Sequence, residues 1–180
     1  ATEPDKLWVA VQNAAGRQVI AGEALAIDRA AAALLQRGVK SRPLPVNRAY
    51  HTPLMSGVQS ALARLLERMQ LSAPSVPLCC NGTGGWLEPA TAMDAQYWAA
   101  HVASAVRWSD NMEALAARTK PAPAPPTLVL ELGSGSTLAP LLAECTHANA
   151  DQLRPISTLR HPKVAYAGGR ADQEVFGEAV

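Results

Sequence analysis

The sequence lacks the features that mark several classes of protein. No run of five or more lysines and arginines occurs in its 180 residues, and the formal net charge is +1. Because nucleic-acid-binding proteins need clustered positive charge, we expect no nucleic-acid partner. No stretch approaches the roughly 18 consecutive apolar residues of a membrane-spanning helix, so we expect no membrane partner either. The first residues, 1–6, have neither the basic nor the apolar region of a signal peptide.

Cysteine is scarce, and its spacing is uninformative for metal binding. The chain has Cys79, Cys80 and Cys145, with no Cys-x-x-Cys pair and no Cys/His ligand pattern. We therefore expect reduced cysteines in the core of a cytoplasmic protein, with no metal site.

Two glycine-rich signatures are also incomplete. A strand, Gly133-x-Gly135 and a helix would suit a dinucleotide, but Leu138 stands where the third glycine belongs. The chain has no Gly-Lys-Ser/Thr triplet for a phosphate loop and no Gly-x-Ser-x-Gly elbow for a nucleophilic serine. We expect no bound cofactor, and a tight strand-to-helix turn at residues 133–137.

What is present alternates between strand and helix patterns. The predicted strands are 7–13, 18–22, 39–46, 76–80 and 127–132. The predicted helices are 24–37, 53–69, 95–103, 109–118 and 138–145. Gly38 is predicted to cap the first helix in a left-handed conformation, and Thr52 to cap the second helix at its start. The apolar stripe predicted to be buried on that second helix is Leu54, Val58, Ala61, Leu62, Leu65, Leu66 and Met69.

One histidine stands at a position suited to chemistry. His51 lies in the segment Asn47–Met55, between a predicted strand and a proline that can begin a helix. A lone histidine is more often structural than catalytic, so its neighbours in the sequence decide the interpretation.

Six blocks, in order along the chain, carry a resemblance to a known family. They are Val9–Asn13 with Val19–Gly22, Leu44–Met55, Asn81–Gly84, Tyr97–Trp108, Leu130–Leu138 and Ser157–Pro162. In these blocks the chain resembles the acyltransferase (malonyl/acyl-CoA:acyl carrier protein transacylase) domain of modular polyketide synthases and related fatty acid synthases, in its C-terminal portion.

The resemblance implies a fold and a division of the chain. The fold would be α/β, with residues 1–46 forming part of a ferredoxin-like small subdomain. Residues 47–153 would form the C-terminal part of an α/β hydrolase-like core, and residues 154–180 the linker that follows the domain.

The resemblance also implies a ping-pong transfer of an acyl group from acyl-CoA to the phosphopantetheine arm of an acyl carrier protein. His51 would be the general base and acid of a Ser-His dyad, oriented by the backbone carbonyl of His101. The selectivity segment would be Arg48, Ala49 and Tyr50, and the bulky Tyr50 favours a malonyl unit. Arg48 departs from the patterns of both malonyl and methylmalonyl domains.

The serine elbow and the carboxylate-binding arginine of the family have no counterpart in these 180 residues. We therefore expect the chain to be inactive alone and to be completed by the N-terminal portion of the same domain. Its other expected partners are the carrier protein and a neighbouring ketosynthase domain. Two alternatives stay open: a non-catalytic docking or scaffold remnant, and an editing acyl hydrolase of the same family.

Overall fold

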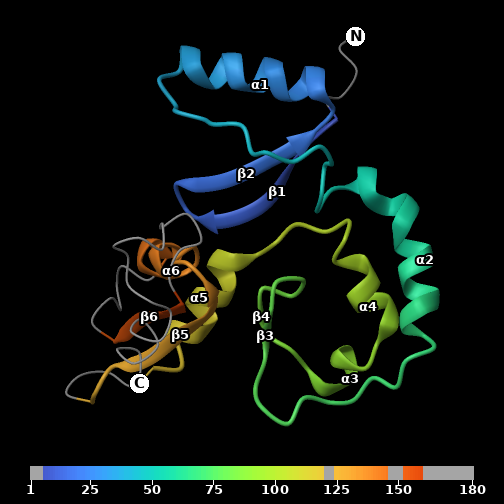
Figure 1. Ribbon diagram of the computed structural model, residues 1–180, viewed down its shortest axis with the longest axis vertical. Helices are drawn as coiled ribbons and strands as arrows, with labels where there is room; N and C mark the ends of the chain where they lie inside the picture. Colours follow the sequence, from blue (N-terminus) through green and yellow to red (C-terminus); the bar gives the residue numbers. More distant parts are fainter. Residues whose placement is uncertain (1–5, 120–123, 146–151, 160–180) are drawn as a thin grey trace, which may run out of the picture. The chain divides into compact units, whose positions relative to one another are not determined.

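A computed structural model of the protein describes residues 6–119, 124–145 and 152–159. These residues form a mixed α/β structure with three two-stranded sheets (Figure 1). The chain divides into two compact units, residues 1–111 and 112–180.

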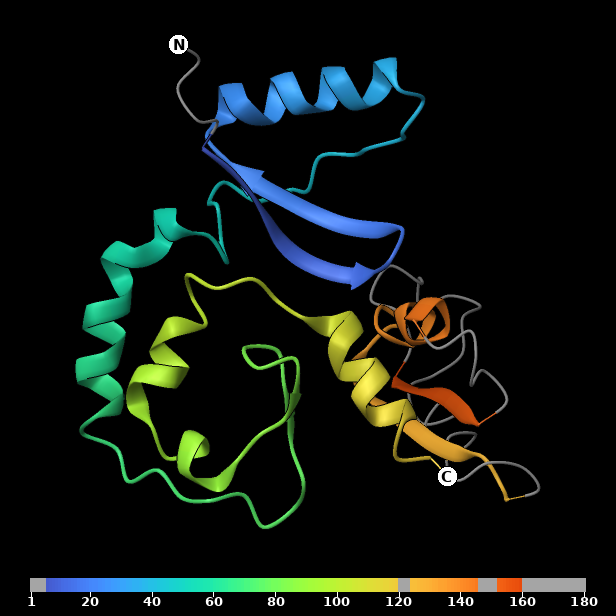
Figure 2. The same ribbon diagram turned by 180° about the vertical axis from the view of Figure 1, so that it is seen from behind.

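The first unit begins with an antiparallel hairpin. Strands β1 (Leu7–Ala14) and β2 (Arg17–Gly22) pair from Leu7 opposite Gly22 to Ala14 opposite Arg17. Helix α1 (Ala24–Gln36) follows directly and runs alongside the hairpin (Figure 2). Both predicted strands and the predicted helix are confirmed.

Helix α1 ends as its sequence predicts. Gly38 has a φ of 73°, a left-handed value that costs glycine little because it has no Cβ. Its amide donates to the carbonyl of Leu35, and the amide of Val39 donates to the carbonyl of Leu34. These two bonds make a Schellman motif, which satisfies carbonyls at the end of the helix.

The predicted strand over residues 39–46 is wrong. This segment is irregular and exposed along its length. Pro43 and Pro45 have no amide proton, so they cannot donate to a strand ladder. Besides β2, strand β1 has Val106 as a neighbour, in an isolated parallel bridge. Val106 accepts from the amide of Gln12 and donates to the carbonyl of Ala10, at 2.8 and 2.9 Å.

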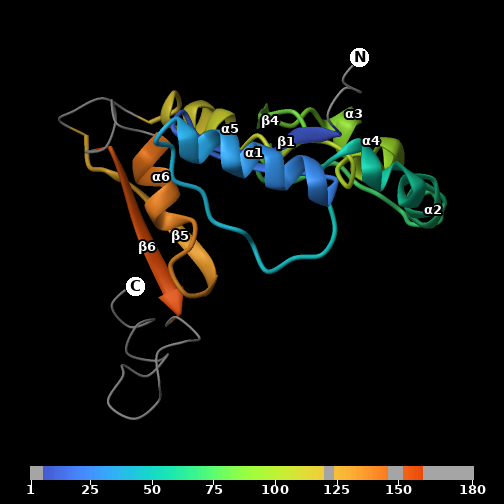
Figure 3. The same cartoon turned by 90° about the horizontal axis from the view of Figure 1, so that it is seen from above.

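A helical layer follows the irregular segment. A 3-10 turn, η1 (Pro53–Met55), leads into α2 (Ser56–Leu66), and α2 packs along α4 (Ala95–Ala100) (Figure 3). In the sequence, α2 and α4 are separated by two short antiparallel strands, β3 (Cys79–Cys80) and β4 (Gly85–Trp86), and by helix α3 (Pro89–Ala92). The predicted strand over 76–80 is thus limited to its last two residues.

The buried face of α2 differs from the predicted stripe. Ala63 is buried, and Gln59, Leu62 and Leu66 are half-buried beside it. The members of the predicted stripe that are exposed instead are Leu54, Val58, Ala61, Leu65 and Met69. The helix carries more apolar residues than α4 covers, so periodicity alone could not show which of them face inward.

The second unit contains a parallel pair of strands joined through a helix. Strand β5 (Thr127–Ser134) leads to α6 (Ala139–Cys145), and β6 (Leu153–Leu159) pairs in parallel with β5. The sequence predicted no strand over Leu153–Leu159, which mixes Arg, Pro, Ser and Thr with its apolar residues. Helix α5 (Trp108–Ala116) spans the boundary between the units in sequence. Residues 160–180 of the predicted linker lie outside the described residues.

Among the described residues, no helix combines the length and the apolar character that crossing a membrane requires.

Candidate functional site

His51 has an unusual backbone conformation. Its φ is 62°, in the left-handed region that residues with a Cβ seldom occupy. The chain around it is fixed by Thr52, whose buried hydroxyl donates to the carbonyl of Ala49 at 2.7 Å. Thr52 therefore does not cap η1 through its side chain, contrary to prediction. A strained residue that its surroundings hold firmly in place is a frequent feature of functional sites.

The side chain of His51 is held by the turn that follows α4. Its Nδ1 lies 3.0 Å from the carbonyl oxygen of His101 and 3.2 Å from that of Ser104, and its own amide donates to the carbonyl of Val102. Carbonyl oxygens only accept, so Nδ1 carries the ring proton and Nε2 is left as the acceptor. A neutral imidazole with an unprotonated Nε2 can take a proton from a bound group.

The ring of His101 lies in a half-buried aromatic cluster. It lies edge-on to Tyr97, with ring centroids 4.8 Å apart, and its centroid is 5.4 Å from that of Trp98. Its Nε2 lies 3.6 Å from the sulfur of Cys80. Burial, and to a smaller extent the proximity of His51, lower the pKa of His101, so this ring is neutral at neutral pH.

The turn Asn81–Gly84 is tied to the start of α5. Arg107 donates to the carbonyl of Thr83 at 2.7 Å and forms an ion pair with Asp110 at 2.6 Å. Asn111, which is buried, donates to the side-chain oxygen of Asn81 at 2.7 Å. These contacts hold the turn against the cluster around His101.

The three predicted selectivity residues precede His51 on an exposed loop. Arg48 donates to the carbonyl of Asn47, Ala49 accepts from Thr52, and Tyr50 is 48% exposed. Tyr50 also lines an open hollow together with residues 44–47. The structure thus brings His51 and the His101 carbonyl into contact and places Tyr50 beside them in sequence, on the surface.

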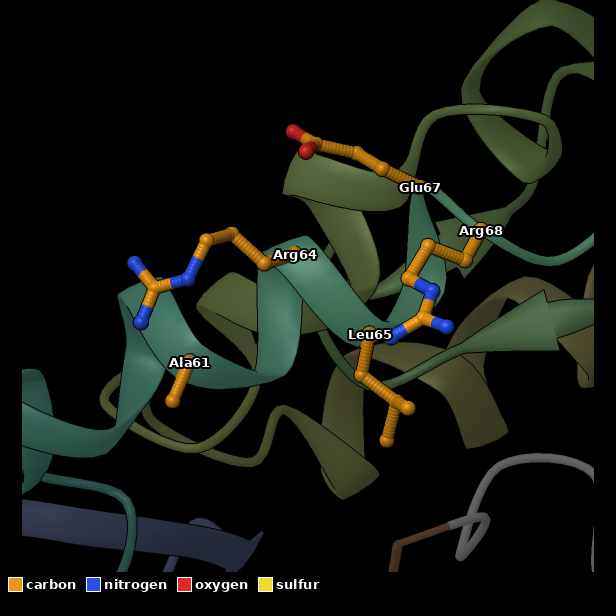
Figure 4. Close-up of a pocket in the computed structure, with 5 residues that line it drawn as sticks. All are labelled: Ala61, Arg64, Leu65, Glu67 and Arg68. Atoms are coloured by element: carbon orange, nitrogen blue, oxygen red, sulfur yellow. The ribbon is translucent and has the colours of Figure 1, made fainter.

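A second hollow lies on the exposed side of α2, and His51 does not line it. Figure 4 shows Ala61, Arg64, Leu65, Glu67 and Arg68 lining it. No residue of this group was predicted to act chemically. Among the described residues, no group of three or more His, Cys, Asp or Glu could hold a metal ion.

The glycine-rich turn after β5 has its own anion. The Glu131 carboxylate accepts from the amides of Thr137, Leu138 and Ala139 at 2.9, 3.0 and 2.9 Å. Partial burial raises the pKa of Glu131, but these three hydrogen bonds together outweigh it and hold the pKa below its ordinary value. The amides that a phosphate would need at this turn are therefore used by the protein itself.

We predict that Glu131→Gln destabilises the fold by about 1 kcal/mol, the usual contribution of a side chain that caps a helix start. The folded-state pKa of Glu131 is lowered, so its contribution is fully present above the ordinary glutamate pKa and is lost as the pH falls through the lowered value. Urea unfolding of both proteins at pH 7 and at pH 3 measures this. A stability difference that does not shrink at pH 3 would contradict the assignment.

The chain is similar to known proteins in both its sequence and its fold. No family model matches the chain. Polyketide synthase GfsA of Streptomyces halstedii is 32% identical over 111 residues, which is 62% of this chain and 2% of that protein.

Two solved structures share the fold. The acyl transferase domain of SpnD, in complex with 2-(pent-4-yn-1-yl)malonyl, is 30% identical with a TM-score of 0.85, and the match covers 97% of this chain and 40% of that one. The malonyl-CoA:acyl carrier protein transacylase of Xanthomonas oryzae pv. oryzae is 29% identical with a TM-score of 0.73, over 90% of this chain and 48% of that one.

The chain therefore spans less than half the length of these proteins, and only a small fraction of the synthase. The predicted resemblance is confirmed: the chain is homologous to the acyltransferase domains of modular polyketide synthases and corresponds to part of such a domain.

Proposed function

We propose that this chain supplies the histidine half of an acyltransferase site, which moves a malonyl-type unit from CoA to the phosphopantetheine thiol of an acyl carrier protein. The observation that carries the proposal is the contact of His51 Nδ1 with the His101 carbonyl oxygen at 3.0 Å. This bond leaves Nε2 free to exchange protons with a nucleophile and a leaving group.

The reaction needs a nucleophile from outside these 180 residues, a serine in the families that the chain resembles. In the first half-reaction, His51 Nε2 takes the serine proton while the serine oxygen attacks the thioester carbonyl. The C–S bond breaks, and the imidazolium returns the proton to the CoA thiolate. In the second half-reaction, Nε2 takes the proton of the phosphopantetheine thiol, sulfur attacks the acyl-serine ester, and the serine oxygen leaves with that proton.

The main-chain oxygen of His101 would do part of the work of the aspartate in a Ser-His-Asp triad. It holds the ring in one tautomer, as the triad carboxylate does, but it brings no buried charge. Tyr50 would limit the size of the acyl branch, which supports malonyl as the substrate. The metal-free chemistry requires only acyl-CoA and the carrier protein as reactants.

Exposed apolar side chains support the proposal that this chain is one part of a larger domain. Leu65 on α2 is 57% exposed, and Leu128, Leu130 and Leu132 on β5 are 54, 50 and 82% exposed. A parallel pair of strands is normally covered on both faces. We propose that the N-terminal portion of the domain covers these side chains and completes a ferredoxin-like subdomain and an α/β hydrolase-like core. A cytoplasmic multienzyme with a ketosynthase neighbour would be its setting.

A transfer assay tests the proposal. The chain is tested alone and after fusion to an N-terminal portion taken from a related acyltransferase domain, here called the completed domain, with malonyl-CoA and a phosphopantetheinylated carrier protein. We expect the completed domain to form malonyl-carrier protein and the isolated chain to form none. Turnover by the isolated chain would contradict the missing nucleophile, and release of free malonate instead of transfer would favour a hydrolase.

A further inference from the structure

A closed cluster lies behind the His51 contact. Cys80, on β3, is 7% exposed and packs with Leu87 and Ala92, and Tyr97 and Trp98 of α4 lie against this group. The ring of His101 completes the cluster, with its Nε2 3.6 Å from the Cys80 sulfur.

The backbone of Gly82 closes over the same ring nitrogen. A Cβ built on Gly82 would lie 2.5 Å from His101 Nε2 and 3.0 Å from the Tyr97 hydroxyl oxygen. The ring of His101 is therefore covered by a main chain on one side and held by a thiol on another. This leaves no room for a substrate at Cys80, so the thiol–imidazole pair is not a second nucleophilic site.

His101 connects this cluster to the candidate site through its own main chain. Its ring contacts Cys80, and its carbonyl oxygen accepts a hydrogen bond from Nδ1 of His51 at 3.0 Å. The residue stands at the C-terminal end of α4, where carbonyl groups lack partners within the helix. A ring that is anchored on one side fixes the Cα, and with it the direction in which this carbonyl points.

We propose that Cys80 is a positioning residue for the site. Its contact with the His101 imidazole holds the carbonyl that keeps the proton of His51 on Nδ1. The thiol can donate to Nε2, or a ring N–H can donate to the sulfur, and either bond anchors the ring. The role of this contact in catalysis rests on the proposed function of His51, but the contact itself can be tested without measuring turnover.

The measurement is the solvent exchange of the His51 Nδ1 proton, followed by nitrogen-15 NMR on the full 180-residue chain. We expect Cys80→Ala to speed this exchange roughly three- to tenfold, the loss expected from one neutral hydrogen bond. Cys80→Ser keeps a proton donor and restores slow exchange. Cys79→Ala, at the neighbouring strand position, leaves the exchange unchanged.

A second variant tests the same link from the other side. His101→Phe keeps the aromatic packing and the carbonyl but removes Nε2, and it should speed exchange as Cys80→Ala does. In the double variant the two effects should not add, because they remove one interaction. Unfolding temperatures measured in parallel show how stable each variant is, because a general loss of stability would speed the exchange of protected protons throughout the protein and not only at His51.

Unchanged exchange in a folded Cys80→Ala or His101→Phe protein would overturn the proposal, as would additive effects in the double variant. If the exchange responds as expected while the completed domain transfers acyl groups without His51, the positioning contact stands and the catalytic proposal fails. The two failures are therefore distinguishable.

Discussion

Replacing His51 in the completed domain lowers the rate of acyl transfer by about 10² to 10⁴-fold, the usual contribution of a positioned acid–base group. The loss follows from its geometry. Nδ1 is committed to the carbonyls of His101 and Ser104, so Nε2 is the ring atom that exchanges protons with the reacting groups. Transfer of malonyl to a phosphopantetheinylated carrier protein, followed by mass spectrometry, measures the loss.

Two replacements separate the chemistry from the strained backbone. His51→Ala places a residue poorly suited to positive φ at this position, whereas asparagine adopts that conformation more readily. His51→Asn should therefore be folded as well as the parent domain and still show the full loss of rate. Gln36→Ser, at an exposed polar position on α1, is the surface control and should transfer at the parent rate. Normal transfer by His51→Asn would show that the domain is a scaffold or that another base acts.

Gly82→Ala should lower both stability and the rate of transfer, although it leaves His51 itself unchanged. The added methyl would lie 2.5 Å from His101 Nε2, and that ring cannot retreat easily because Tyr97 and Trp98 pack against it. We expect destabilisation of about 1 to 3 kcal/mol, the usual cost of overpacking. We also expect transfer in the completed domain to slow by about 10²-fold, since a displacement near 1 Å can cost that much.

Gly57→Ala on α2 is the matched glycine control. A Cβ at Gly57 meets nothing within 4 Å, and the position is helical. Alanine there should stabilise the protein by up to about 1 kcal/mol and leave transfer unchanged. Urea unfolding and the transfer assay check both variants. Equal behaviour of the two would show that the space around His101 is not restricted.

The sequence predicted the elements whose signals are local. The helix over Ala24–Gln36 follows from its alanines and leucines and from the glycine that ends it, and each of these signals acts within a few residues. The approach of His51 to the His101 carbonyl was expected from the resemblance to a family. Nothing in the spacing of two histidines 50 residues apart would indicate it.

The elements that the sequence did not predict correctly depend on pairing with residues distant in the sequence. Residues 39–46 have apolar residues suited to a strand, but their prolines deprive them of donors, and the Val106 segment lies beside β1 instead. Residues 153–159 have a weaker pattern and still form β6, because β5 offers them a parallel partner. Cys80 was predicted as a core residue, and its contact with His101 depends on a turn that brings β3 against the end of α4.

In the proposed reaction, one histidine moves the proton in both halves of the transfer. Single-turnover kinetics of the completed domain separate acylation by malonyl-CoA from deacylation by the carrier protein. We predict that His51→Asn slows both steps by similar factors, each of about 10² or more. A loss confined to one step, or no loss in either, would contradict the claim.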